Sequence, residues 1–184
     1  MKRQIPFVLL IVLPAFALSS EWFEGENLLT NPIPFSEDYE LYSKDEPGWV
    51  SRLWKNKEND GDTYVVNIVE GRAPNLAKFR DSQDAPGKGA CSSFSSVVLS
   101  DDDRNGFKSV FWETNCIIDE VEITSLQLAI GGRDSLYHVR KLWKTPVENS
   151  VVESWKGEIS QISLCDTRKK KHPCPEGFEK ADDT

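Results

Sequence analysis

Short segments that alternate apolar and polar residues constrain the fold of this chain more than any other feature. The clearest is VEITSLQLAI, residues 121–130, in which Leu126, Leu128 and Ile130 fall on one face of an extended strand. We expect this row of side chains to face the core. Turn sequences that supply the positive φ angles of tight hairpins separate such segments. They are Asn59-Asp60-Gly61, Asn105-Gly106 and Gly131-Gly132.

Helical signals are weaker than strand signals. Residues 75–83 are expected to form one or two turns of helix. Residues 151–159 are expected to form a single turn, since Gly157 argues against a longer helix. The last apolar segment, residues 158–166, alternates and is predicted to be the closing strand. Many short strands joined by turns predict an all-β fold, a β-sandwich of antiparallel sheets with one or two short helices.

The N-terminus has the charge pattern of a secretory signal peptide. Met1-Lys2-Arg3 is a basic start, IPFVLLIVLPAFAL is apolar, and small residues follow up to Ser19 and Ser20. The apolar segment is too short to cross a bilayer comfortably, and no stop-transfer pattern follows it. We therefore expect residues 1–19 to be removed and the protein to be secreted or periplasmic, with no stable membrane anchor. The alternative is an uncleaved N-terminal anchor.

The remaining chain is strongly acidic. Without Lys2 and Arg3, 20 basic residues face 30 acidic ones, so the formal charge is −10. Such a chain repels nucleic-acid phosphates, and no basic stripe offsets that repulsion, so we expect no nucleic-acid partner. The basic cluster RKKKH, residues 168–172, is expected to belong to a solvated tail.

Four cysteines predict a disulfide-stapled fold. An even number of cysteines behind a signal peptide is typical of an oxidising compartment. Three pairings are open, and we favour the two local ones, Cys91 with Cys116 and Cys165 with Cys174. A zinc site is not favoured, because no C-x-x-C motif occurs. The expected domains are a binding domain over residues 20–166 and a polar tail over residues 167–184, tied by the second disulfide.

The stretch IGGRDSLYHVRKLW, residues 130–143, raises the question of catalysis. It contains Asp134, Ser135 and His138, but on one strand Asp134 and His138 lie about 13 Å apart. No G-x-S-x-G motif occurs, so the patterns favour a hairpin over a serine hydrolase. Similarly, DDDRNG, residues 101–106, resembles the start of a calcium loop, but Trp112 occupies the position of its last ligand. A hairpin turn is favoured there too.

Both ends of the chain resemble the galactose-binding-like jelly rolls, which include carbohydrate-binding modules and the sugar-binding domains of some F-box proteins. The matching features are an NLLTNP entry from Asn27, an early tryptophan at Gly48-Trp49, and a closing I-x-x-I-x-L-C-D strand that ends at Asp166. The resemblance implies a jelly roll of two antiparallel sheets. It also implies a structural calcium near Asp166. The family's acid next to the early aromatic residue is shifted here by one position, to Glu37.

Carbohydrate recognition by this family implies aromatic side chains that pack on sugar C–H faces and polar groups that contact hydroxyls. Trp49 and Trp54 are the favoured tryptophans, because they flank the short segment VSRL. Arg133 and Asp134 follow a glycine turn at a loop tip, where hydroxyl contacts are typical. The other tryptophans are expected mostly in the core. The complete predicted ligand set is Trp49, Trp54, Tyr64, Arg133, Asp134 and Tyr137, with Asp166 as the metal ligand.

The favoured function is therefore a non-catalytic binding domain that recognises carbohydrate and requires no cofactor. One alternative is a protein-binding secreted or envelope factor on the same fold, such as an inhibitor or immunity-type protein, whose acidic surface would suit a basic partner. A further alternative is a hydrolase with an unrecognised carboxylate pair. The sugar hypothesis predicts exposed aromatic residues, whereas the hydrolase hypothesis predicts two facing carboxylates, one with a raised pKa.

Overall fold

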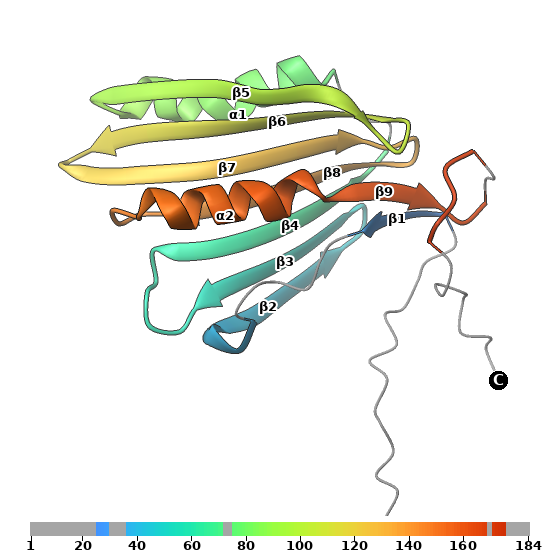
Figure 1. Cartoon of the computed structure of the whole chain (residues 1–184), viewed down its shortest axis with the longest axis horizontal. Coiled ribbons are helices and arrows are strands. Elements are labelled where there is room, and N and C mark those ends of the chain that lie inside the picture. Colours follow the sequence, from blue (N-terminus) through green and yellow to red (C-terminus); the bar gives the residue numbers. More distant parts are fainter. Residues whose placement is uncertain (1–24, 30–35, 72–74, 169–170, 176–184) are drawn as a thin grey trace, which may run out of the picture.

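Figure 1 shows a computed structural model of the chain, which describes residues 25–29, 36–71, 75–168 and 171–175. The predicted signal peptide, residues 1–19, lies outside these ranges. The elements within them are β1 (Glu26–Leu29), η1 (Ser36–Asp38), β2 (Tyr39–Glu46), β3 (Trp49–Asn56), β4 (Asp62–Glu70), α1 (Leu76–Ala90), β5 (Ser93–Arg104), β6 (Phe107–Ile118), β7 (Val121–Gly131), β8 (Ser135–Trp143), α2 (Asn149–Ser160) and β9 (Ser163–Asp166).

Seven strands form one antiparallel sheet in the order β2-β3-β4-β8-β7-β6-β5. Two hairpin-connected groups build it, β2 to β4 and β5 to β8, and they meet where β4 pairs with β8. Helix α1 carries the chain from β4 in the middle of the sheet to β5 at its edge. Strands β1 and β9 pair with each other in a separate two-stranded sheet at one end of the molecule (Figure 1).

One helix lies over each face of the large sheet, α2 over the front and α1 behind β5 and β6 (Figure 1). The α2 face carries the larger core. The predicted row Leu126, Leu128 and Ile130 is completely buried there, as expected from its alternation. From α2, Val152, Trp155 and Ile159 pack on the same core at spacings of three and four residues. The α1 face carries a smaller cluster of Val110, Trp112, Ala129 and Leu136, against which Leu76 and Phe79 of α1 pack.

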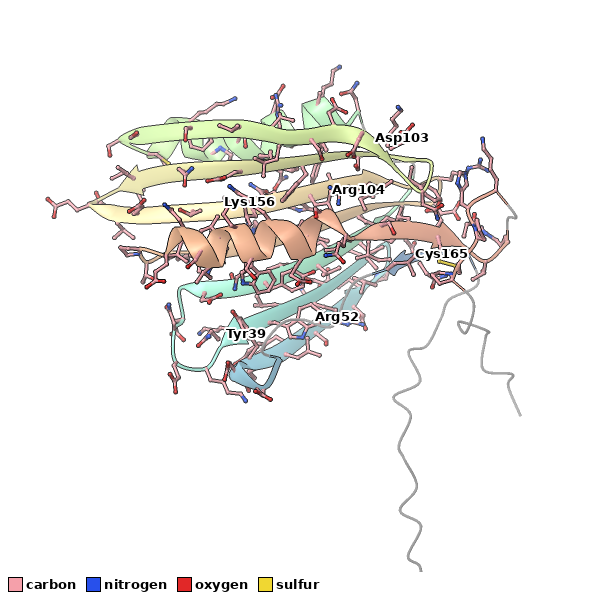
Figure 2. All side chains as sticks on the ribbon, in the orientation of Figure 1. Tyr39, Arg52, Asp103, Arg104, Lys156 and Cys165 are labelled. Carbon is pink, nitrogen blue, oxygen red and sulfur yellow. A yellow bond between two sulfur atoms is a disulfide. The ribbon has the colours of Figure 1, made fainter. Side chains whose placement is uncertain are left out.

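Two cationic side chains fasten α2 to the sheet (Figure 2). Arg104, at the end of β5, donates to the carbonyl oxygens of Ile159 and Ile162 at 2.8 and 3.0 Å. The Ile159 oxygen lies in the last turn of α2, and the Ile162 oxygen lies in the link between α2 and β9. Lys156 reaches Glu113 on β6 at 2.8 Å. Arg104 thus holds the last turn of α2 and the link to β9 against the sheet.

The fold-class prediction is confirmed in its main terms. The protein is mostly β, with two antiparallel sheets, two short helices and two disulfides. The division of strands between the sheets, seven and two, is more unequal than the jelly-roll expectation implied. Helices therefore cover the faces of the large sheet.

Both predicted disulfides are confirmed. Cys91, directly after α1, bonds to Cys116 on β6, with 5.5 Å between the two Cα atoms. Cys165 on β9 bonds to Cys174, so the predicted tie between the domain and the residues after it is present. The first disulfide fixes the C-terminal end of α1 against the sheet.

The predicted hairpin turn at Asn105-Gly106 is also confirmed. It joins β5 to β6, and the two residues have φ angles of 51° and 79°. Gly106 has a second role, because a Cβ atom there would lie 2.4 Å from the ring of His172. His172 packs on Phe107 with 4.7 Å between ring centroids. The turn thus docks the disulfide-closed segment that follows β9.

The extents of both helices and of the last strand differ from expectation. Helix α2 runs through Gly157, whose cost of about 1 kcal/mol is outweighed by the burial of Trp155 and Ile159. Residues 158–160 are therefore helical, and β9 begins only at Ser163. Helix α1 continues through Pro86 to Ala90, because long-range contacts hold its second half. The disulfide at Cys91 is one of them.

Candidate functional site

The two favoured tryptophans lie on opposite faces of the large sheet. Trp49 and Trp54 are both on β3, five residues apart, so the two-residue period of a strand points them in opposite directions. Trp54 is on the α2 face, 5.5 Å from the ring of Tyr64. Trp49 is on the α1 face, where its register partner on β4 is Val69. They do not form one binding platform.

Trp49 belongs to a part of the sheet that no helix covers within the described residues. Helix α1 packs on β5, β6 and β7 and reaches β8 through Phe79, whose ring lies 5.1 Å from that of His138. The same face of β2, β3 and β4 lies beyond these contacts. Its residues are partly or fully exposed, except Val65, which is 9 % exposed. We call this surface the open face. It includes Tyr42, Lys44, Glu46, Trp49, Ser51, Leu53, Asn67 and Val69, and Lys44 pairs with Glu46 at 2.8 Å.

The open face combines aromatic and polar groups. Tyr42 is 48 % exposed and Val69 is 40 % exposed, whereas Trp49 is half-buried. The ammonium group of Lys44 lies 5.2 Å from the centre of the Trp49 ring. At an exposed site such a cation–π contact is worth only about 0.5–1 kcal/mol. A ligand can therefore displace Lys44 from the ring at small cost.

The other predicted aromatic residues lie in or against the core on the α2 face. Tyr64 and Tyr137 are only 4 % and 3 % exposed. Trp54 is half-buried and packs against the same cluster. Three further tryptophans, Trp112, Trp143 and Trp155, are buried, as expected for most of them. Of the predicted aromatic ligands, Trp49 alone lies on the open face.

Arg133 and Asp134 are exposed at the tip between β7 and β8, as predicted for this hairpin. Their backbone N–H groups donate to the carboxylate of Glu26 on β1, at 2.6 and 3.3 Å. The Asp134 carboxylate pairs with Arg168. Tyr137 donates to the carbonyl oxygen of Glu26 at 3.3 Å. These contacts tie the hairpin tip to β1 and to the segment after β9. The tip lies at the same end of the sheet as Trp49, two strands away, since Trp49 pairs with Val69 and Val69 pairs with Leu136.

Asp166, the predicted metal ligand, pairs with a cation of the chain itself. Its carboxylate accepts hydrogen bonds from the backbone N–H and Nε of Arg168 at 2.9 and 3.0 Å. These hydrogen bonds lower the pKa of Asp166. Among the described ranges, no three His, Cys, Asp or Glu side chains are grouped so that they could hold a metal ion. In these ranges Asp166 therefore has no cluster of further acidic side chains beside it to help hold the predicted calcium.

The stretch from Ile130 to Trp143 forms the β7–β8 hairpin, and its Asp134 and His138 side chains take separate partners. Asp134 is engaged by Arg168. His138 is buried on the α1 face, where Nε2 lies 3.2 Å from Oε1 of Gln127. Gln127 donates its own Nε2–H to Ser125, so its Oε1 is the acceptor and His138 is the donor. Burial lowers the pKa of His138 to about 3, so the ring is neutral at physiological pH.

The hydrolase alternative predicts a carboxyl group with a raised pKa, so the pKa values of the carboxyl groups are relevant to it. Three described carboxyl groups, Asp45, Glu113 and Asp166, have shifted pKa values, and all three pKa values are lowered. For Glu113, burial acts to raise the pKa, but hydrogen bonds from Lys156 and Asn115 outweigh it. The raised carboxyl pKa that a general acid needs is thus not found among these three groups.

Sequence reasoning missed a hollow between α1 and β5. Its volume is about 490 Å³, and Arg80, Asp84, Lys88, Phe94 and Ser96 line it. The three charged residues recur every four positions, which puts them on one face of a helix. This four-residue spacing could have indicated the site from the sequence. It was not used, because the helix was expected to end near residue 83, before Asp84 and Lys88.

Comparisons with known proteins do not place the chain in a family. No protein-family model matches it, and no curated protein does. Among solved structures, the solution structure of cyanobacterial PsbP (CyanoP) from Synechocystis is similar over 82 % of this chain and 99 % of that chain. The TM-score is 0.46 and the sequence identity is 12 %. In the described ranges, neither helix has the length and apolar character needed to cross a membrane.

Proposed function

We propose that this protein is a non-catalytic, extracytoplasmic binding protein that recognises carbohydrate on its open face. The two disulfides support an oxidising compartment, because such bonds persist mainly in secreted and periplasmic proteins. They agree with the signal peptide expected at residues 1–19. The disulfides and the expected signal peptide are compatible with a secreted protein and with a periplasmic one.

One observation carries the carbohydrate proposal: Trp49 and Tyr42 are accessible on the same uncovered sheet surface. Tyr42 lies opposite Leu53, four residues along β3 from Trp49, which corresponds to about 13 Å along the strand. Ser51 and Asn67 lie opposite each other on this face and offer hydrogen-bonding groups. Aromatic rings contact the C–H faces of sugars, and polar groups contact their hydroxyls. The spacing suits an oligosaccharide better than a single sugar.

The first test is a titration of the oxidised protein with soluble polysaccharides and oligosaccharides, followed by tryptophan fluorescence, with and without EDTA. We expect a saturable change with one class of glycan. Loss of this change in EDTA would support the calcium predicted at Asp166. A folded protein that responds to none of these glycans would contradict the proposal.

A matched pair of variants on β2 then locates the site. Tyr42 and Leu41 are neighbours with similar exposure, 48 % and 51 %, but they point to opposite faces. By calorimetry, Tyr42→Ala and Trp49→Ala should each weaken glycan binding about tenfold or more, a loss of roughly 1.4 kcal/mol. Leu41→Ala should leave the affinity unchanged. Equal losses for Tyr42→Ala and Leu41→Ala would rule out the open face.

A protein partner is the second candidate function, and the outer strand β5 favours it. Val97, Val98 and Leu99 are 55 %, 40 % and 38 % exposed on this long edge strand. Exposed edge strands can pair with a strand from another chain. If no glycan binds, a pull-down from the same compartment would be the next experiment. Val97→Lys should then reduce retention of a genuine partner, whereas Tyr42→Ala should not.

A further inference from the structure

The hollow between α1 and β5 is built from two rigid walls. One wall is a single face of α1, with Arg80, Asp84 and Lys88. The other is the inward face of β5, with Phe94 and Ser96. Phe94 and Ser96 are the register partners of Cys116 and Thr114 on β6, and the Cys91–Cys116 disulfide shows that this is the face beneath α1.

Close packing fixes the distance between these walls. A Cβ atom on Gly87 would lie 2.4 Å from the ring of Phe94, so only glycine lets the helix approach this ring. The Cys91–Cys116 bond holds the end of α1 one turn later. Because both restraints are internal to the fold, a ligand does not have to order the hollow before binding.

The carboxylate of Asp84 is held at the base of the hollow. Asp84 is only 2 % exposed, and its Oδ1 accepts a 3.2 Å hydrogen bond from the indole N–H of Trp112. A carboxylate accepts about four hydrogen bonds, so one indole donor leaves most of this capacity unused. Burying a charge with a single partner is costly unless another donor is supplied. A ligand that carries hydroxyl groups would supply it.

The cations of the hollow are also incompletely paired. Nε of Arg80 is buried and has no hydrogen-bond partner in the described structure. Its NH2 group binds Asp81 instead, at 3.1 Å. In the described part of the chain, neither Arg80 nor Lys88 forms an ion pair with Asp84. The hollow therefore presents donors for an anion on the same wall as an acceptor for hydroxyl groups.

We propose that this hollow is a second binding site, for an acidic monosaccharide such as a hexuronate. The sugar carboxylate would bind Arg80 and Lys88, because guanidinium and ammonium donors form strong charge-assisted bonds with carboxylates. Sugar hydroxyls would donate to Asp84 and contact Ser96. The ring of Phe94 would pack on a C–H face. This site is separate from the open face, and binding at one does not depend on binding at the other.

The indole N–H of Trp112 provides a direct readout, because it donates to Asp84. We would titrate the full protein with D-glucuronate and follow this resonance by ¹H–¹⁵N NMR, assigning it from its displacement in Asp84→Asn. A saturable shift with D-glucuronate is expected. D-glucose, which lacks the carboxylate, and acetate, which lacks the hydroxyls, should produce far smaller shifts at the same concentration. No saturable shift with D-glucuronate, or equal shifts with acetate or D-glucose, would overturn the proposal.

Variants distinguish the hollow from the general charge of the surface and from the open face. Arg80→Gln and Lys88→Gln should each weaken D-glucuronate binding about tenfold. Lys78→Gln, an exposed position on the same helix, should have no effect. An equal loss in Lys78→Gln would indicate non-specific attraction and overturn the proposal. Trp49→Ala should weaken glycan binding by the open face but preserve the D-glucuronate shift, so the two proposals fail or succeed separately.

Discussion

Lys141 and Asp62 form an ion pair on the α2 face, with the lysine side chain completely shielded from solvent. The Lys141 ammonium also lies 4.4 Å from the centre of the Trp155 ring and donates to the hydroxyl of Tyr39 at 2.8 Å. Burial lowers the pKa of Lys141 to about 8, although Asp62 acts in the opposite direction. With this pKa, Lys141 stays mostly charged at neutral pH, and Asp62 favours the charged form.

Removing Asp62 should cost more stability than removing Lys141. Asp62→Asn leaves an uncompensated buried charge and should lower the free energy of unfolding by about 3–5 kcal/mol. Lys141→Met should cost less, because Asp62 is 15 % exposed and keeps its hydrogen bond from Tyr39. Urea denaturation measures both losses. Asp60→Asn, which removes an 85 % exposed carboxylate paired with Lys55, is the near-neutral control. The reverse order of costs would contradict this view of the pair.

His138 should make the protein sensitive to acid. The pKa of His138 is about 3 in the folded state and about 6.5 in the unfolded chain, so the unfolded state binds more protons between these values. Stability attributable to His138 is therefore complete above pH 6.5 and is lost as the pH falls toward 3, by about 1.4 kcal/mol per pH unit. Chemical denaturation of the wild type and His138→Gln from pH 7.5 to 4.5 measures it. Parallel curves for the two proteins would refute the assignment.

Two glycine substitutions should change stability in opposite directions. Gly106→Ala should destabilise the protein by more than about 1–2 kcal/mol, because φ is 79° and the new Cβ would meet His172. Gly157→Ala should stabilise it by up to about 1 kcal/mol, since this helix position has no heavy atom within 4 Å of a Cβ. Thermal unfolding followed by circular dichroism compares them. A stabilising Gly106→Ala would mean that the turn relaxes without the left-handed conformation.

The two disulfides should contribute unequally. On the chain-entropy model, closing 25 residues between Cys91 and Cys116 contributes about 3.5 kcal/mol, and closing 9 residues between Cys165 and Cys174 about 2.6 kcal/mol. We expect the Cys91→Ala/Cys116→Ala variant to have the lower Tm. Calorimetry of both double variants tests this order. A much larger loss for Cys165→Ala/Cys174→Ala would indicate that docking of His172, not chain entropy, dominates.

Local patterns predicted the parts of the fold that depend on local rules. Alternation identified Leu126, Leu128 and Ile130 as core residues, and the dipeptide Asn105-Gly106 identified a turn. Both depend on backbone geometry within a few residues. The same strand period, applied to the five-residue spacing of Trp49 and Trp54, predicts opposite faces. No strand was predicted over residues 49–56, so this period was not applied when the two residues were grouped in one site.

Long-range contacts account for what local patterns did not predict. Helix α1 carries Pro86 and Gly87, which ordinarily end a helix, but the Asp84–Trp112 hydrogen bond and the Cys91 disulfide hold that half in place. Neither contact can be predicted from the sequence of the helix alone, because both partners, Trp112 and Cys116, lie on β6. The hollow beside Asp84 was missed for the same reason. Arg168, two residues after Asp166, was the local signal that a cation of the chain itself would pair with the predicted calcium ligand.

The pairing of β1 with β9 determines how the domain would respond to mechanical force. Glu26 lies opposite Asp166, and the backbones of Gly25 and Thr167 continue the ladder by a 2.9 Å hydrogen bond. A load applied at these two neighbouring points would pull the strands apart at one end, so their hydrogen bonds would break one after another. Such unzipping needs little force compared with shearing all of them together. The small sheet should therefore yield first, while the seven-stranded sheet behind it stays intact.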